Sequence, residues 1–135
     1  MAADPLDAWY AAIRTGDAAA LAAATTEDVT LLWNGDPSRI PWAGRHDGRA
    51  GVAAFFASVA RHLEVLSIER LARLDARDAA TVVLAARWRV RANGREVASR
   101  AANLFRLRDG RVASYEVYND TAVFERALAP RDPAS

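Results

Sequence analysis

The sequence contains no cysteine and no lysine, and each absence excludes a class of chemistry. Without cysteine there is no disulfide, no thiol nucleophile and no cysteine-ligated metal site. All 18 basic residues are arginine, so a Schiff base on a lysine amine cannot form. Histidine is scarce too, because only His46 and His62 are present, and two imidazoles are few for a metal centre. We therefore expect no metal site and no cofactor.

Long apolar runs and an excess of one charge are also missing. No apolar stretch approaches the roughly 20 residues that cross a bilayer as a helix. The N-terminal segment MAADPLDAWY is acidic and lacks the basic and then apolar order of a signal peptide. The formal net charge of +1 gives no general attraction to nucleic acid. These features predict a cytoplasmic protein that contacts neither membrane nor nucleic acid.

Helical periodicity dominates the first half of the chain, and alternation with β-branched residues dominates the second. The length fits one domain over residues 1–135, with an ordered core at 5–128 and a disordered tail at 129–135. The predicted elements are helices from Asp4-Pro5 to Gly16 and from Asp17 to about Thr25, a strand at 29–33, a helix carrying Val52 to Leu63, strands near 65–74, 80–92, 95–107 and 111–119, and a helix from Thr121 to Leu128 that Asp120 caps.

Two turns set the register of the predicted sheet. Asn93-Gly94 suits a two-residue hairpin, whose central positions both need positive φ. That turn places Trp88 opposite Ser99, Ala86 opposite Ala101 and Leu84 opposite Asn103.

The segment Arg108-Asp109-Gly110 allows either a two-residue turn or a three-residue loop with Gly110 in a bulge. The two-residue turn would turn Ser114 and Glu116 inward. The loop puts Ala113, Tyr115 and Val117 inward instead, and burial favours it. The inner face then carries Leu84, Ala86, Trp88, Ala101, Asn103, Phe105, Tyr115, Val117 and Asn119.

Several short segments resemble the nuclear transport factor two-like superfamily. They are Gly16-Asp17, IPWAG at 40–44, GRAGVAAFF at 48–56, LFRLRDGRV at 104–112 and YNDTAVF ending at Phe124. The resemblance covers about Leu6 to Leu128 and is closest to ketosteroid-isomerase-like and SnoaL-like bacterial members. It implies an α+β fold of the cystatin-like α+β barrel type: a cone-shaped, curved antiparallel sheet packed on three N-terminal helices, with a short C-terminal helix. It implies little about the reaction, because this superfold hosts isomerases, cyclases, hydratases, epoxide hydrolases and plain binding proteins.

Most of the catalytic positions that the resemblance implies hold other residues here. The general-base Asp of steroid isomerases corresponds to Trp33, and their helical Tyr corresponds to Trp9, with Tyr10 one position away. Their protonated Asp corresponds to Asn103, whose amide still provides a donor. The Arg and two Asp of limonene epoxide hydrolases fall on Leu84, Ala86 and Val117, which disfavours that mechanism. The Glu and His of many SnoaL-like relatives, near Val117 and Asn103, are also missing.

The stretch IPWAGRHDG at 40–48 is too apolar for an ordinary surface loop, and Pro41, Gly44 and Gly48 interrupt helix and strand. In the implied fold it is a loop beside the open end of the cone. Trp42 would then cover the opening, and His46 or Asp47 would be the titratable group nearest a ligand. The alternative, an exposed turn, stays open for both residues.

The remaining candidates have structural alternatives. Asn103 and Tyr115 could stabilise an oxyanion, or they could be a buried amide and a core aromatic that satisfy each other. The implied cavity makes Trp33, Trp42 and Trp88 pocket walls rather than core residues, together with Leu84, Ala86, Phe105, Val117 and Asn119.

Arg87, Arg89 and Arg91 alternate onto the outer face of the predicted sheet, near Arg100. Nucleic-acid binding is disfavoured there, because acidic residues balance the charge and Trp88 points to the other face. In the superfamily this face commonly pairs subunits, which predicts a homodimer.

The expected function is cofactor-independent acid–base chemistry, of isomerase or cyclase type, on a small apolar cyclic or polyketide-like carbonyl compound. The reaction would take place in an enclosed cavity, with Asn103 and Tyr115 at the oxyanion and His46 or Asp47 moving the proton. The rival is a non-catalytic binder of an apolar small molecule, which the loss of acid–base positions favours. A structural dimerisation module is a third possibility.

Overall fold

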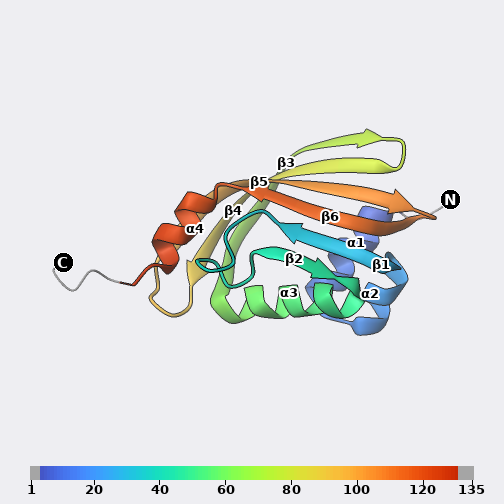
Figure 1. Ribbon diagram of the computed structural model, residues 1–135. Coiled ribbons are helices and arrows are strands. Elements are labelled where there is room, and N and C mark those ends of the chain that lie inside the picture. Colours follow the sequence, from blue (N-terminus) through green and yellow to red (C-terminus); the bar gives the residue numbers. More distant parts are fainter. Residues whose placement is uncertain (1–3, 131–135) are drawn as a thin grey trace.

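The computed structural model describes residues 4–130, which form a curved six-stranded sheet with helices packed on one side (Figure 1). The strand order is β2-β1-β6-β5-β4-β3; β1 and β6 run parallel, and every other neighbouring pair is antiparallel. The elements are α1 (Pro5–Thr15), α2 (Ala18–Ala24), β1 (Thr25–Trp33), β2 (Gly44–Asp47), α3 (Gly48–His62), β3 (Leu63–Ala76), β4 (Ala79–Val90), β5 (Glu96–Arg108), β6 (Arg111–Asn119) and α4 (Thr121–Leu128). The α+β class and the curved sheet are as predicted, and the sheet does not close into a barrel.

Capping residues place the first two helices where the sequence predicts them. The Asp4 side chain accepts a hydrogen bond from the Leu6 amide, and Pro5 fills the first helical position. Gly16 ends α1 with a φ of 68°, a conformation that favours glycine. Asp17 then caps α2 through the Ala19 amide. Leu6 and Trp9 on α1 are thereby fully buried against the sheet.

The helix α3 connects the two opposite edges of the sheet, β2 and β3, and therefore crosses its concave side (Figure 1). Its Val52 and Phe55 are buried, while Phe56 and Val59 are partly buried against the core. The last helix, α4, lies at the other end of the sheet and buries Phe124. Asp120 occupies its N-cap position but makes no side-chain capping bond.

The predicted loop at 40–48 contains a strand that the sequence did not reveal. Gly44–Asp47 pairs with Thr30–Trp33 as an antiparallel edge strand, and Ile40, Trp42 and Ala43 before it are buried. The prediction that the glycines prevent a strand was wrong, because Gly44 (φ 98°) and Gly48 (φ 74°) lie at its two ends. They turn the chain into and out of the strand.

Both predicted turns differ in detail from the structure. The chain closes between Val90 and Arg95 rather than around a two-residue Asn93-Gly94 turn, so Trp88 lies opposite Val97 and Ala86 opposite Ser99. The Asn93 side chain explains the longer turn, because it donates to the Ala127 carbonyl and accepts from the Arg95 amide. The register moves by two residues, which keeps every side chain on its predicted face.

At the second turn the two-residue form is present and the three-residue loop is not. Asp109 and Gly110 both have positive φ (55° and 70°), as a type I′ hairpin requires, and Arg108 pairs with Arg111. The extra residue lies instead at Ala113, where the register between β5 and β6 shifts. This bulge restores the predicted face for Tyr115 and Val117, which pair with Phe105 and Asn103.

No helix within 4–130 is long and apolar enough to cross a membrane. The predicted tail at 129–135 lies outside the described residues from position 131 onward.

Candidate binding site on the concave face of the sheet

The predicted inner-face residues all lie on the concave side of the sheet. Their strand partners and alternating burial place them in common rows, such as Val82, Asn103 and Val117 across β4, β5 and β6. The degree of burial divides the face into two parts. Ala86, Asn103, Phe105, Tyr115 and Val117 are buried, whereas Leu84, Trp88, Ala101 and Asn119 are only partly buried.

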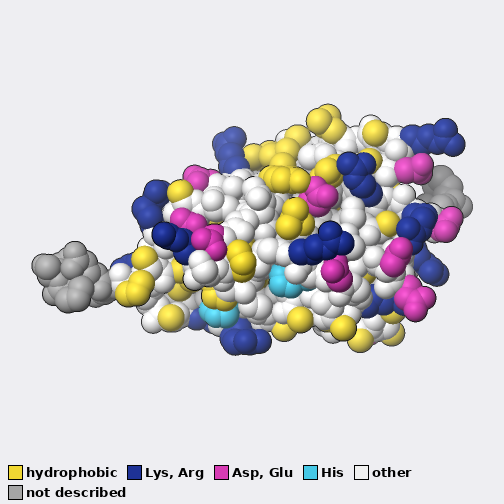
Figure 2. Space-filling view, in the orientation of Figure 1, with side chains coloured by type: hydrophobic (Ala, Val, Ile, Leu, Met, Phe, Trp, Pro, Cys, Tyr) yellow, Lys and Arg dark blue, Asp and Glu magenta, His cyan; other side chains and the backbone are white. Residues whose placement is uncertain are grey.

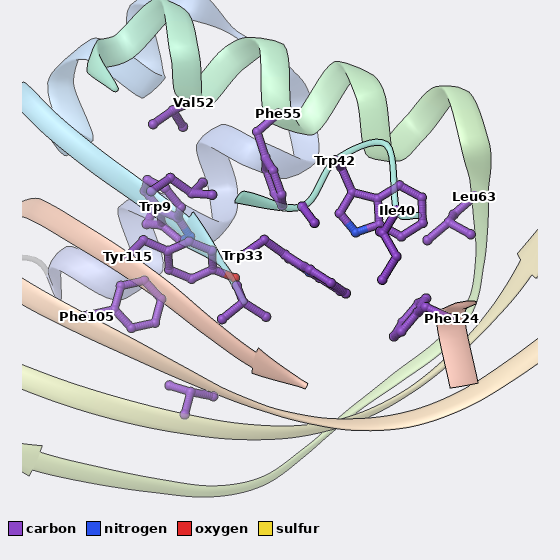
Figure 3. Packing of buried hydrophobic residues seen from close by; sticks show 14 of the residues in the cluster. Trp9, Trp33, Ile40, Trp42, Val52, Phe55, Leu63, Phe105, Tyr115 and Phe124 are labelled. Atoms are coloured by element: carbon purple, nitrogen blue, oxygen red, sulfur yellow. The ribbon is translucent and has the colours of Figure 1, made fainter. Parts of the chain in front are cut away.

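Aromatic rings fill the buried part of the concave side (Figure 3). One group joins Trp9 of α1 to Tyr115 and Phe105 of the sheet, with ring centroids 4.8 and 6.0 Å apart. A second group joins Trp33 to Trp42 at 5.8 Å and to Phe124 at 5.4 Å. Trp33 and Trp42 therefore belong to the core and are not open pocket walls in this structure.

Two open surface hollows of the described residues lie away from the predicted site. One, of about 580 Å³, lies between β5 and α4 and is lined by Val97, Val123 and Arg126 among others. The second lies beside the end of α4, at Asn93 and Leu128. Neither is lined by a predicted site residue. On the concave face, Leu84, Trp88 and Ala101 of β4 and β5 form a partly buried strip next to the aromatic filling.

A hydrogen-bonded pair of polar side chains lies inside this apolar surrounding. Asn103 is 2% exposed, and its Nδ2 donates to Tyr10 Oη at 3.4 Å. Asn103 Oδ1 is buried and accepts no hydrogen bond from any described residue. Because a buried unpaired polar atom costs free energy, this carbonyl is a place where a ligand or a water would be stabilised.

The family resemblance does not identify Tyr10, one member of this pair, as a site residue. The resemblance puts the helical tyrosine at Trp9, with Tyr10 one position away. In the structure Trp9 packs among the rings with its Nε1 buried and unpartnered, and Tyr10 reaches Asn103. The signal available in the sequence was a tyrosine directly beside the apolar stripe of α1.

The two tyrosine hydroxyls near Asn103 are donors at neutral pH. Burial raises the pKa of Tyr10, more than the hydrogen bond from Asn103 lowers it. Burial also raises the pKa of Tyr115, and the nearby Tyr10 adds to that increase. Tyr115 makes no hydrogen bond to Asn103, contrary to the sequence-based alternative that paired them. Both phenols can donate a hydrogen bond, and neither is suited to remove a proton from a substrate.

The structure does not bring the predicted proton carriers to this pair. His46 is partly buried on β2, where its Nε2 lies 2.9 Å from the Trp42 carbonyl oxygen and its ring packs on Phe55 at 5.2 Å. Figure 2 shows both histidine side chains, in cyan, at the surface of the molecule. Asp47 is exposed, pairs with Arg45 and points to the opposite face of the strand.

Within residues 4–130 no three His, Asp or Glu side chains are grouped so that they could hold a metal ion. The polar groups of the concave face include the amides of Asn103 and Asn119, the Ser99 hydroxyl, the phenols of Tyr10 and Tyr115 and the Trp9 indole. These groups can donate and accept hydrogen bonds to a small molecule.

Comparison with known proteins supports this architecture. Residues 6–115 match the family model of the SnoaL-like domain. An NTF2-like protein from Burkholderia xenovorans is 26% identical, with a TM-score of 0.83 and 93% of each chain covered. A Catenulispora acidiphila protein with a ketosteroid isomerase-like fold, in complex with trimethylamine, is 20% identical, with a TM-score of 0.72 and 96% of each chain covered.

A proposed SnoaL-like polyketide cyclase from Mesorhizobium loti is 12% identical, with a TM-score of 0.68, covering 84% of this chain and 94% of that one. A search among curated proteins gave no match. The family and fold matches confirm the resemblance inferred from the sequence.

Proposed function

The chain belongs to the SnoaL-like domain family, and from this premise we propose that it binds a small apolar molecule carrying a carbonyl or hydroxyl group. The ligand would lie on the concave face, with its polar group at Tyr10 and Asn103. The observation that carries this proposal is the buried Asn103 amide, which has one end on Tyr10 and the other end unpaired.

The chemistry of the amide explains why either kind of polar group fits. In the described orientation the free Oδ1 accepts a hydrogen bond from a ligand hydroxyl. A half-turn of the amide places Oδ1 toward the Tyr10 hydroxyl and leaves Nδ2 free to donate to a ligand carbonyl. The surrounding rings of Trp9, Phe105 and Tyr115 exclude water and favour an apolar body.

Among residues 4–130 no carboxylate or imidazole hydrogen-bonds to Asn103 or Tyr10, which favours binding over catalysis. The charged groups that act on Tyr10 are the guanidinium groups of Arg70 and Arg73, which are not proton acceptors, and burial raises the pKa of both Tyr10 and Tyr115. A carboxylate or a free imidazole would be expected next to the polar group of a substrate if the site moved a proton.

One observation still favours an isomerase or cyclase as the second candidate. The Tyr10 hydroxyl and the Asn103 amide are adjacent donors, and two such donors can stabilise the oxyanion of an enolate. His46 would then be the proton carrier on the same face, since it shares a row with Leu31 and Tyr115. Two strand spacings put it about 10 Å from Tyr115, so a substrate would have to bridge that distance.

The test uses para-hydroxybiphenyl as a probe and follows binding by calorimetry and by tryptophan fluorescence. We expect saturable binding that weakens about tenfold in Asn103→Leu and in Tyr10→Phe. A tenfold weaker affinity corresponds to a loss of about 1.4 kcal/mol of binding free energy, the size expected for one hydrogen bond. Tyr118→Phe is the matched control, because Tyr118 is 42% exposed and bonds only to Glu116. Equal affinities in the wild type, Asn103→Leu and Tyr10→Phe would overturn the proposal.

Catalysis is tested on the same variants and on His46→Gln, with a cyclic ketone in deuterated water. An isomerase-type site would accelerate exchange of the protons next to the carbonyl, and Asn103→Leu would lose that acceleration. Binding without exchange identifies a binder, whereas exchange that depends on Asn103 and His46 establishes the second candidate.

We also propose that two copies pair through the outer face of the sheet. This face carries Val83, Ala85, Leu104 and the exposed Tyr118, together with Arg87, which pairs with Glu96. A Leu104→Arg substitution would place a charge in the interface. Sedimentation should then show a monomer in place of a dimer, and a monomeric wild type would contradict the pairing.

A further inference from the structure

A second unsatisfied polar side chain lies on the same strand and the same face as Asn103. Ser99 is 8% exposed, and its Oγ is buried without a hydrogen-bond partner among the described residues. Positions 99, 101 and 103 alternate with the exposed Ala98 and Arg100, so their side chains all point to the concave side. Four residues at about 3.3 Å each separate Ser99 from Asn103 by about 13 Å.

The residues between the two polar groups are apolar. Ala101 lies midway on β5, and Ala86 pairs with Ser99 on the neighbouring strand β4. Alanine side chains end at Cβ, so they add no polar atom and little bulk between the two polar groups. Leu84 and Trp88 on either side of Ala86 are partly buried and border this strip.

A buried serine hydroxyl in a strand normally finds a partner, and leaving it unpaired costs about 1–3 kcal/mol. We propose that Ser99 is a second anchor for the ligand, which is then an elongated apolar molecule with a hydrogen-bonding group at each end. This inference rests on the proposed function, since Asn103 and Tyr10 hold the first end. It adds that the ligand extends along β5 toward α4.

The test compares two rigid probes, para-hydroxybiphenyl and para,para-dihydroxybiphenyl, which differ only by the hydroxyl at the second end. For the wild type we expect the dihydroxy probe to bind about tenfold more tightly. Ser99→Ala should remove that preference and leave the affinity for the monohydroxy probe unchanged. Asn103→Leu should weaken both probes by a similar factor.

Ser114→Ala is a closely matched control. Ser114 Oγ is also buried and unpartnered, but Ser114 pairs with Arg106 and Thr30 on the outer side of the sheet. This variant should keep the wild-type preference for the dihydroxy probe. Melting temperatures of both serine variants should stay at or above that of the wild type, which shows that they are folded.

Each result decides between the two proposals. The second anchor is overturned if Ser99→Ala still prefers the dihydroxy probe, or if the wild type shows no preference. The proposed function stands in either case if Asn103→Leu still weakens binding of the monohydroxy probe. A Ser99 hydroxyl that holds only a water gives this same result. No binding of either probe to the wild type overturns both proposals.

Discussion

Asn103→Leu separates a ligand-facing amide from a structural one, because the two roles predict opposite changes in stability. Leucine has a similar volume and removes both polar atoms. The lost hydrogen bond to Tyr10 is long, at 3.4 Å, so its net contribution is about 0.5 kcal/mol, at the low end for such bonds. The removed Oδ1 is buried and unpaired, which returns about 1–3 kcal/mol. We therefore expect the unliganded variant to be more stable than the wild type by about 1 kcal/mol.

The assay is urea unfolding followed by tryptophan fluorescence, supported by thermal melting. For a chain of 135 residues, 1 kcal/mol corresponds to a rise in Tm of about 3–4 °C. The same variant should bind para-hydroxybiphenyl about tenfold more weakly. A variant that is destabilised by 1 kcal/mol or more, with unchanged probe affinity, would refute the reasoning and make Asn103 a structural amide.

Three further substitutions test other contacts. His46→Gln should lower the free energy of unfolding by about 1 kcal/mol through its hydrogen bond to the Trp42 carbonyl, and should leave probe affinity within twofold; a tenfold loss of affinity would place the imidazole at the ligand. Hydrogen bonds from Arg73 hold the pKa of Asp4 below its ordinary value, so this contact stabilises the fold above about pH 4 and is lost as the pH falls further. Arg73→Met should therefore flatten the dependence of the urea midpoint between pH 6 and pH 3. Asn93→Ala should release the end of α4 from the β4–β5 turn, seen as faster amide exchange in α4 and a loss of about 1–2 kcal/mol, and unchanged exchange would contradict this anchoring role.

Much of the fold follows from local sequence signals. Asp4, Pro5 and Gly16 set the bounds of α1, and the alternation of apolar residues set the inner face of β4 and β5. These signals depend on residues close together in the chain, so they can be recognised in the sequence alone. The predicted inner face of β4 and β5 is correct although the predicted register is not, because the register error at the Asn93 turn is two residues, an even number.

The features that the sequence did not reveal depend on distant contacts. The strand β2 forms because β1 offers it a partner, and four residues between glycines carry little periodicity of their own. The length of the Asn93 turn depends on the Ala127 carbonyl, 34 residues away. No local pattern contains that information.

The candidate site was predicted only in part, because some of its contacts join residues that are distant in the sequence. The inner position of Asn103 followed from strand alternation, and the structure confirms it. Its partner Tyr10 lies 93 residues away on α1, and only the packing of that helix brings the two together. The prediction that His46 or Asp47 lies near the ligand depended on a loop at 40–48. In the structure both residues belong to strand β2 instead.

The central claim, that the Asn103 amide meets the ligand, is tested most directly by nuclear magnetic resonance of side-chain amides. The Asn103 signals of ¹⁵N-labelled protein are identified by their absence in Asn103→Leu, and the wild type is titrated with para-hydroxybiphenyl. We predict that the Asn103 amide signals shift saturably with the same Kd as the fluorescence change, while those of Asn34, which is exposed, stay in place. Saturable binding that leaves the Asn103 signals unmoved would contradict the account.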